Sequence, residues 1–233
     1  ILEKAKSAFG AKDYQTAFEI WKSLAERRNA EAQINLGRMY SYGRGVKQNH
    51  KKAVKWYQLA GEQGNAEAQF NCGLMHHNGL GVKQDHKEAV KWYQLAGEQG
   101  NAEAQINLGR MYANGRGVLR DNKEAVKWYR LAGEQGNAEA QFNCGLMHHN
   151  GLGVKQDHKE AVKWYQLAGE QGNAEAQINL DLLLKETENT EAQNNLDLLL
   201  EKKGNSAAQS ILGLLLKKKD FWKRVKGIFG QSN

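Results

Sequence analysis

Two sets of cysteine and histidine residues are the groups in this sequence most able to do chemistry. Cys72 and His76 are four residues apart, a spacing that places both on one face of a helix. Thiolate and imidazole groups are good zinc ligands, so this spacing suggests a metal site. The pattern recurs 72 positions later, and the candidate metal ligands are therefore Cys72, His76, Cys144 and His148.

The same positions have a second interpretation, in which they pack and bind no metal. Equivalent positions elsewhere in the chain hold Leu36 and Leu108 in place of cysteine, and Tyr40 and Tyr112 in place of histidine. A buried free cysteine behaves as a small hydrophobe, so we expect no cofactor. The two cysteines are also expected to lie too far apart for a disulfide bond.

A column of asparagines is the main candidate for recognition of a partner. Asparagine is a mediocre residue in a helix interior, but its amide offers a donor and an acceptor to an extended peptide. Its alternative role is to bond within the scaffold and fix the packing of helices. The column consists of Asn35, Asn71, Asn107, Asn143 and Asn179, with Asn195 as a further member.

Neighbouring columns alternate between cationic and apolar side chains. Arginine binds carboxylates in a fork, so the alternation would suit a ligand that carries carboxylates and apolar anchors. The candidate contact residues are Arg38, Leu74, Arg110, Leu146 and Tyr42. A further column either faces the same ligand or belongs to the core, and it consists of Ile34, Phe70, Ile106 and Phe142.

A repeat of 36 residues positions all of these groups. Shifted by that period, the sequence aligns with itself without gaps, and one of the resulting columns is Trp56, Trp92, Trp128 and Trp164. The 28 residues from Asn78 to Gln105 recur identically from Asn150 to Gln177. A fixed period of this size is typical of a solenoid, in which each unit buries its apolar faces against its neighbours.

Each unit is predicted to be a pair of helices. In one unit Asn65 caps a first helix, and the glycines of "NGLGVKQ" interrupt the chain after it. Asp85 caps a second helix, and Glu88 three residues later completes a capping-box pattern. A glycine in each first helix, such as Gly73, is expected to let the two helices approach closely. The absence of proline agrees with a helical chain.

The unit resembles the Sel-1-like repeat, a relative of the tetratricopeptide repeat, in the segments "AEAQINLGRMY", "GRGV" and "KKAVKWYQLAGEQGN". The resemblance covers residues 30–180, with four full copies. It implies an all-α fold, a right-handed superhelix of antiparallel helix pairs whose first helices line a concave face. Members of this family mostly serve as adaptors or scaffolds that hold other proteins.

The two ends depart from the repeat and divide the chain into three predicted parts. Residues 1–28 have the short turn "GAKDYQTA" and are predicted to form a tetratricopeptide-like helix pair. Residues 29–172 hold the four repeats. Residues 173–233 shorten the spacing to 16 and are predicted to cap the solenoid. The capping helices are expected to begin after Asn173, Asn189 and Asn205, with a last short helix after Asp220.

Positive charge is concentrated at the C-terminal end. The formal net charge is +7, of which +6 lies in residues 201–233. The nearly neutral body is therefore not predicted to bind nucleic acid. Residues 217–229 form a basic amphipathic pattern that either contacts a membrane surface or a partner, or covers the end of the solenoid. No segment approaches the apolar length of a membrane span.

We expect a non-enzymatic adaptor that binds a protein or peptide on its concave face, in an oligomeric state that the sequence leaves open. The chain has no phosphate-binding loop followed by lysine, no nucleophile elbow and no distinctive pair of carboxylates. One alternative is a bacterial periplasmic or secreted factor, attached through its basic C-terminal helix. The first residue, Ile1, fits removal of a signal peptide. The other alternative is a metal-binding protein.

Overall fold

The computed structural model describes residues 1–202, and over that range every regular element is a helix. The helices are α1 (Leu2–Gly10), α2 (Tyr14–Glu26), α3 (Ala30–Tyr42), α4 (His50–Gly61), α5 (Ala66–Asn78), α6 (His86–Glu98), α7 (Ala102–Asn114), α8 (Asn122–Glu134), α9 (Ala138–Asn150), α10 (His158–Glu170) and α11 (Ala174–Lys202). Residues 1–178 form one compact unit, and a second unit begins at Asn179.

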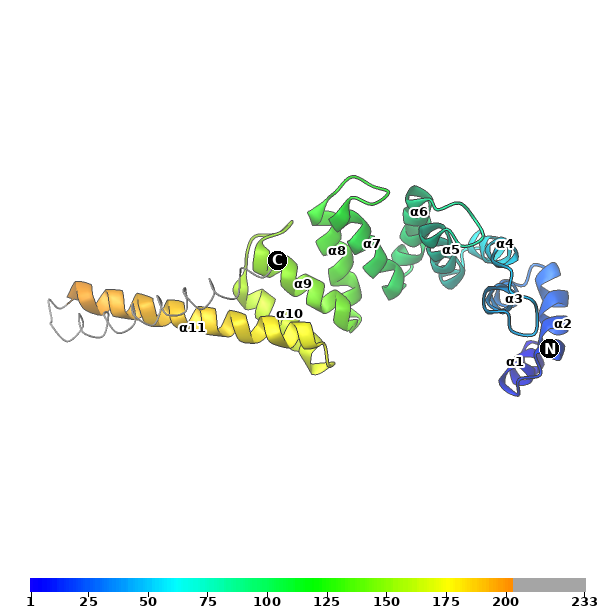
Figure 1. Cartoon of the computed structure of the whole chain (residues 1–233), viewed down its shortest axis with the longest axis horizontal. Coiled ribbons are helices and arrows are strands. Elements are labelled where there is room, and N and C mark those ends of the chain that lie inside the picture. The colour runs from blue at the N-terminus through cyan, green and yellow to red at the C-terminus, as the bar shows by residue number, and fades with distance from the viewer. Residues whose placement is uncertain (203–233) are drawn as a thin grey trace, which may run out of the picture. The chain divides into compact units, whose positions relative to one another are not determined.

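Within the first unit, successive helices pack as pairs along a curved array (Figure 1). Each repeat supplies a first helix, one of α3, α5, α7 and α9, and a second helix, one of α4, α6, α8 and α10. The second helix packs on its own partner and on the first helix of the next repeat, and α5 also contacts α7. The expected all-α solenoid of antiparallel helix pairs with 36-residue repeats is confirmed.

Polar side chains start the helices where the sequence predicts. The Ala68 N–H donates to Oδ1 of Asn65 at 3.0 Å, and the Glu88 N–H donates to Oδ1 of Asp85 at 3.0 Å. Only half of the predicted capping box is present. The Glu88 carboxylate accepts from Lys91 Nζ at 2.8 Å, and the Asp85 N–H donates to the His76 carbonyl at 2.9 Å. The backbone partner therefore replaces the expected side-chain partner of Asp85.

The glycine-rich loop of each repeat ends the first helix and packs on the preceding repeat. Gly79 has φ +68° and caps α5 in the left-handed conformation that glycine adopts without strain. Gly81, with φ +73°, lies directly against the backbone of His50 at the start of α4, where a Cβ would overlap the carbonyl group. The two glycines therefore have different tasks, since one turns the chain and the other admits a neighbour.

Other glycines allow aromatic rings to fill the spaces between helices. A Cβ added to Gly37 of α3 would lie 2.6 Å from Cε1 of Tyr57, which packs from α4. The prediction that this column of glycines lets paired helices approach closely is confirmed. Between repeats, a Cβ on Gly61 would lie 3.0 Å from Cζ3 of Trp92. The Trp-Tyr pairs of the second helices therefore serve packing within and between repeats.

The C-terminal helix corrects one prediction. We expected a new helix to start after Asn189, but α11 runs without a break from Ala174 to Lys202. The boundaries before Asn65, Asn101, Asn137 and Asn173 each have a glycine with positive φ, such as Gly172 at +85°, and Arg28 takes a positive φ before Asn29, whereas Glu188 precedes Asn189 inside the helix. Next to this point, Thr190 Oγ1 donates a hydrogen bond to the Glu186 carbonyl one turn back in the same helix, at 2.8 Å. The predicted helices after Asn205 and Asp220 lie outside the described residues.

Candidate partner-binding surface

One stripe of side chains follows the solvent-facing side of the first helices. In each repeat it contains four positions, spaced at i, i+4, i+7 and i+11, which lie on one face of a helix. We call this surface the first-helix strip. It consists of Glu31, Asn35, Arg38 and Tyr42 on α3, Glu67, Asn71, Leu74 and Asn78 on α5, Glu103, Asn107, Arg110 and Asn114 on α7, and Glu139, Asn143, Leu146 and Asn150 on α9. All of these residues are half-buried or exposed.

The asparagine column lies on the strip, with one amide hydrogen already used by its own helix. Asn71 Nδ2 donates to the Glu67 carbonyl at 2.9 Å, and Asn107 Nδ2 donates to the Glu103 carbonyl at 2.8 Å. Asn35 and Asn143 make the same contact one turn back. These bonds hold each amide against its helix and leave further polar capacity on the half-buried side chain. Asn179, also half-buried, lies on α11 in the second unit.

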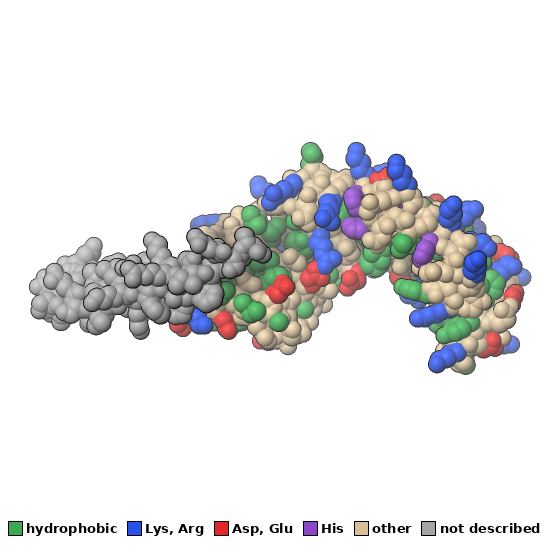
Figure 2. Space-filling view, in the orientation of Figure 1, with side chains coloured by type: hydrophobic (Ala, Val, Ile, Leu, Met, Phe, Trp, Pro, Cys, Tyr) green, Lys and Arg blue, Asp and Glu red, His purple; other side chains and the backbone are tan. Residues whose placement is uncertain are grey.

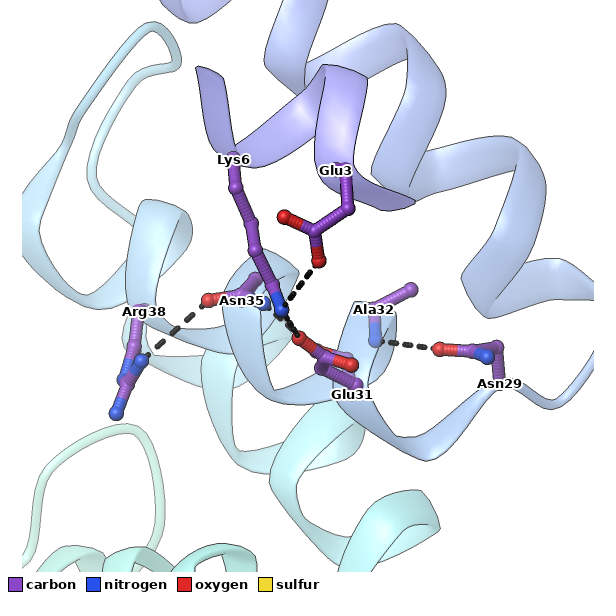
Figure 3. A network of polar contacts seen from close by, with 7 residues as sticks. All are labelled: Glu3, Lys6, Asn29, Glu31, Ala32, Asn35 and Arg38. Atoms are coloured by element: carbon purple, nitrogen blue, oxygen red, sulfur yellow. Dashed lines mark hydrogen bonds and ion pairs between the residues drawn. The ribbon is translucent and has the colours of Figure 1, made fainter. Parts of the chain in front are cut away.

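The two arginines of the strip already have carboxylate partners. Arg38 on α3 forms an ion pair with Glu67 on α5, and Arg110 on α7 forms one with Glu139 on α9. Lys6 on α1 reaches Glu31 on α3 in the same way, at 2.7 Å. Figure 3 shows this lysine between Glu3 and Glu31, with Arg38 directed at Asn35. The ion pairs of Lys6 with Glu31, Arg38 with Glu67 and Arg110 with Glu139 each join the first helices of neighbouring pairs.

Leucines occupy the arginine position in the other two repeats. Leu74 and Leu146 are half-buried and present an apolar surface beside the asparagines. Tyr42, at the end of α3, is 68% exposed. The predicted contact residues therefore share one face, although their partner remains a prediction.

The isoleucine and phenylalanine column belongs to the core. Ile34 and Ile106 are 4% and 2% exposed, so they cannot contact a ligand on the strip. Phe142 is half-buried, and its ring centroid lies 6.0 Å from that of Tyr165 on the paired helix. Of the two interpretations that the sequence left open for this column, packing is the one that the structure supports.

The structure does not favour the metal interpretation, because both thiols lie in the core. Cys72 and Cys144 are free and buried, and burial raises the pKa of Cys144 to about 12, while it raises the pKa of Cys72 further. A thiol in such surroundings resists conversion to the thiolate that binds metal. Among residues 1–202, no group of three or more histidine, cysteine, aspartate or glutamate side chains is placed to hold a metal ion.

The second helices offer a different surface. In Figure 2, several lysine and arginine side chains lie along the upper edge of the described part of the chain. An open depression of about 450 Å³ lies near the loop after α3, and one of about 600 Å³ lies between repeats, lined in part by Trp128, Lys127 and Gln135. Lys87 and Lys91 on α6 are exposed. A partner bound here would not touch the asparagine column.

A column of buried glutamines was not among the residues predicted from the sequence. Gln69 is 4% exposed; its Nε2 donates to the Gly61 carbonyl at 3.0 Å, and its Oε1 accepts from Gln99 Nε2 at 2.6 Å. Equivalent bonds link Gln105 to Gly97 and Gln135. A polar residue that recurs in every repeat beside buried alanine was the available signal. The column ties successive repeats together and so fixes the spacing of the first-helix strip.

Comparison with known proteins defines the class. Residues 30–65, 66–101, 102–137 and 138–173 each match the Sel1 repeat family. The chain is a Sel1-type α-solenoid, a relative of the tetratricopeptide-repeat proteins. Because these four matches cover more than half of the sequence, the chain belongs to the Sel1 repeat family, whose members are generally non-enzymatic scaffolds for protein interaction.

Solved structures agree with this assignment. A Sel1 repeat protein from Oxalobacter formigenes is 38% identical with a TM-score of 0.74, and the match covers 77% of this chain and 74% of that one. The protective antigen c5321 of uropathogenic Escherichia coli, which displays an SLR fold, is 42% identical with a TM-score of 0.67. That match covers 68% of this chain and 34% of the antigen.

A curated relative matches over a shorter stretch. The sel1-like repeat-containing protein R815 of Acanthamoeba polyphaga mimivirus is 54% identical over 39 residues, which are 17% of this chain and 7% of that protein. The chain thus spans a small part of this relative. Among the described residues, no helix combines the length and apolar character that crossing a bilayer requires. The basic segment 217–229 lies outside the described residues.

Proposed function

We propose that this chain is a non-enzymatic adaptor that holds a protein or an extended peptide on the concave face lined by its first helices. The observation that carries the proposal is the first-helix strip, which places a half-buried asparagine at the same point of four successive helices. Amides at a regular spacing suit the backbone of an extended chain, which presents donors and acceptors at regular intervals.

The packing of the repeats supports this use of the strip. The column of buried glutamines and the Trp-Tyr pairs hold each first helix in place without using the strip. The strip's side chains can therefore contact a partner while the scaffold remains intact. A binding surface that is already ordered in the free protein lowers the entropy lost on binding.

Affinity capture from a cell extract tests the proposal. The bait is the full chain, compared with the triple variant Asn71→Ala, Asn107→Ala and Asn143→Ala. Alanine favours helices more than asparagine does, so the triple variant should fold at least as stably. We expect it to lose the main captured protein.

A matched control separates the strip from the second helices. Gln94 and Gln166 are exposed amides at equivalent positions of α6 and α10. Changing both to alanine removes amides from the other side of the solenoid and should leave capture intact. A partner that the triple variant keeps and this double variant loses would place the site on the second helices and contradict the proposal.

A further inference from the structure

We infer that the partner segment bound by the first-helix strip is cationic and apolar, with a Lys or Arg side chain placed against Glu103 and an apolar side chain over Leu74. This inference rests on the proposed function and names the chemistry of its ligand. It reverses the sequence-based expectation of a ligand rich in carboxylates.

The first step is the charge of the strip. Its four repeats carry four glutamates and two arginines, a net charge of −2. Both arginines are engaged by Glu67 and Glu139, so a carboxylate on a ligand would have to displace a carboxylate of the scaffold. A cation on a ligand meets no such competitor at Glu103, because the preceding first helix supplies no arginine to it.

The second step is a gap in the row of ion pairs. Glu31, Glu67 and Glu139 each pair with a cation from the preceding first helix. Glu103 is exposed, and among residues 1–202 its carboxylate has no ion-pair partner, because Leu74 stands at the position from which arginine would reach it. A carboxylate of the strip is thus left for a ligand at this point.

The third step is the apolar neighbour of that carboxylate. Leu74 is half-buried and lies one first helix before Glu103, with Asn71 and Asn107 in the same row. An apolar side chain of the ligand can cover this leucine while a neighbouring Lys or Arg meets the carboxylate.

Two fluorescein-labelled peptides of equal length serve as probes, one of alternating Leu and Lys and the other of alternating Leu and Glu. Binding to the full chain is followed by fluorescence anisotropy. The full chain has a formal charge of +7, so unspecific attraction would favour the Leu-Glu peptide. We expect the opposite order, with the Leu-Lys peptide binding more tightly and weakening at high salt.

Three variants locate the binding. Glu103→Gln removes the carboxylate, and Leu74→Arg supplies the ion pair that the neighbouring repeats have. Each should weaken binding of the Leu-Lys peptide about two- to fivefold, the scale of one exposed charge interaction. Arg110→Leu releases Glu139 and should strengthen binding. As a control, Glu98→Gln removes an exposed carboxylate of α6 and should change nothing.

The inference is overturned if the Leu-Glu peptide binds more tightly, if neither peptide binds, or if Glu103→Gln and Leu74→Arg leave the Leu-Lys peptide unaffected. None of these results bears on capture by the asparagine variants. A partner lost in the triple asparagine variant together with preference for the acidic peptide would keep the proposed function and reject the cationic ligand. A partner retained there would reject the proposed function itself.

Discussion

Two 50-residue segments of this chain, Leu59–Leu108 and Leu131–Leu180, are identical in sequence but not in environment. Most of their local geometry is the same, as at Gly79 and Gly151, with φ of +68° and +66°. The environments of the two segments differ near their C-terminal ends. Ile106 is 2% exposed, whereas its counterpart Ile178 is 59% exposed.

The cause lies in the residues that follow each segment. Ile106 packs with Ala132 of α8, and the next glycine, Gly109, admits the ring of Tyr129 from the same helix. After the second segment comes Asp181, and α11 continues to Lys202 without a glycine-rich loop. A repeat therefore specifies its own helices, while the next repeat decides which of its side chains become core.

The largest effect is expected where a loop meets the preceding repeat. Gly81→Ala and Gly153→Ala each place a methyl group on a backbone with φ of +73°, against the carbonyl of His50 or Asn122. The left-handed conformation and the overlap should together cost about 2–5 kcal/mol of local stability. Urea unfolding followed by circular dichroism measures the loss.

The position of each change should determine how much helix is lost. Gly81 lies in the middle of the array, so its substitution should weaken the contact between two internal repeats. Gly153 lies near the end of the unit, so its substitution should cause early loss of the last repeats while the others stay folded. Identical, single transitions for both variants would contradict a nearest-neighbour description. Gly64→Ala is a control for the conformational cost, since nothing lies near its missing Cβ.

The next effect tests the comparison directly. Ile106→Ala empties a packed position and should destabilise the chain by about 2–4 kcal/mol, whereas Ile178→Ala should cost less than about 1 kcal/mol. The five residues before each isoleucine are identical, so helix propensity cancels in the comparison. Thermal unfolding of the two variants gives the difference. Equal losses would mean that Ile178 is buried in solution.

Much of this architecture can be predicted from the sequence because each repeat carries its own signals. The capping asparagines, the loop glycines and the Gly-Tyr contacts are local or lie within one helix pair, and the period displays them four times. The metal candidates show the limit of such reasoning. Cys72 has the right spacing to His76, but only the fold shows that its thiol is buried in the core.

The end of the array and the charge pairing were harder to predict. The break expected at Asn189 was inferred from a capping residue alone, although the boundaries before Asn65, Asn101, Asn137 and Asn173 also have a glycine with positive φ. The arginines were expected to be available to a ligand. The sequence does not show that Glu67, which comes 29 residues after Arg38, lies beside it in space. Contacts between repeats follow from the superhelix and are not visible in one period.

Cysteine reactivity should reveal a smaller difference between the copies. Cys72 and Cys144 are both buried with raised pKa values, so a thiol reagent must wait for local opening. Cys144 lies closer to the end of the array, where opening costs less. In the single-cysteine variants Cys72→Ser and Cys144→Ser, we expect Cys144 to react several-fold faster. A faster Cys72 would show that the middle of the array opens first.

The smallest expected effect is a loss of stability as the pH falls. The pKa of His77 is lowered, first by burial and then by repulsion from His86, Arg116 and Arg110. The unfolded chain therefore binds a proton more readily than the folded chain. The contribution of neutral His77 to the free energy of unfolding should be fully present above the ordinary histidine pKa of about 6.5. It should decrease as pH falls through the lowered pKa. Denaturant titrations across this range measure the loss.

Serine, which stands at the equivalent position 41, is a natural replacement for this histidine. His77→Ser should reduce the dependence of stability on pH below 6.5. An unchanged pH dependence in His77→Ser would mean that this histidine does not cause the loss of stability in acid.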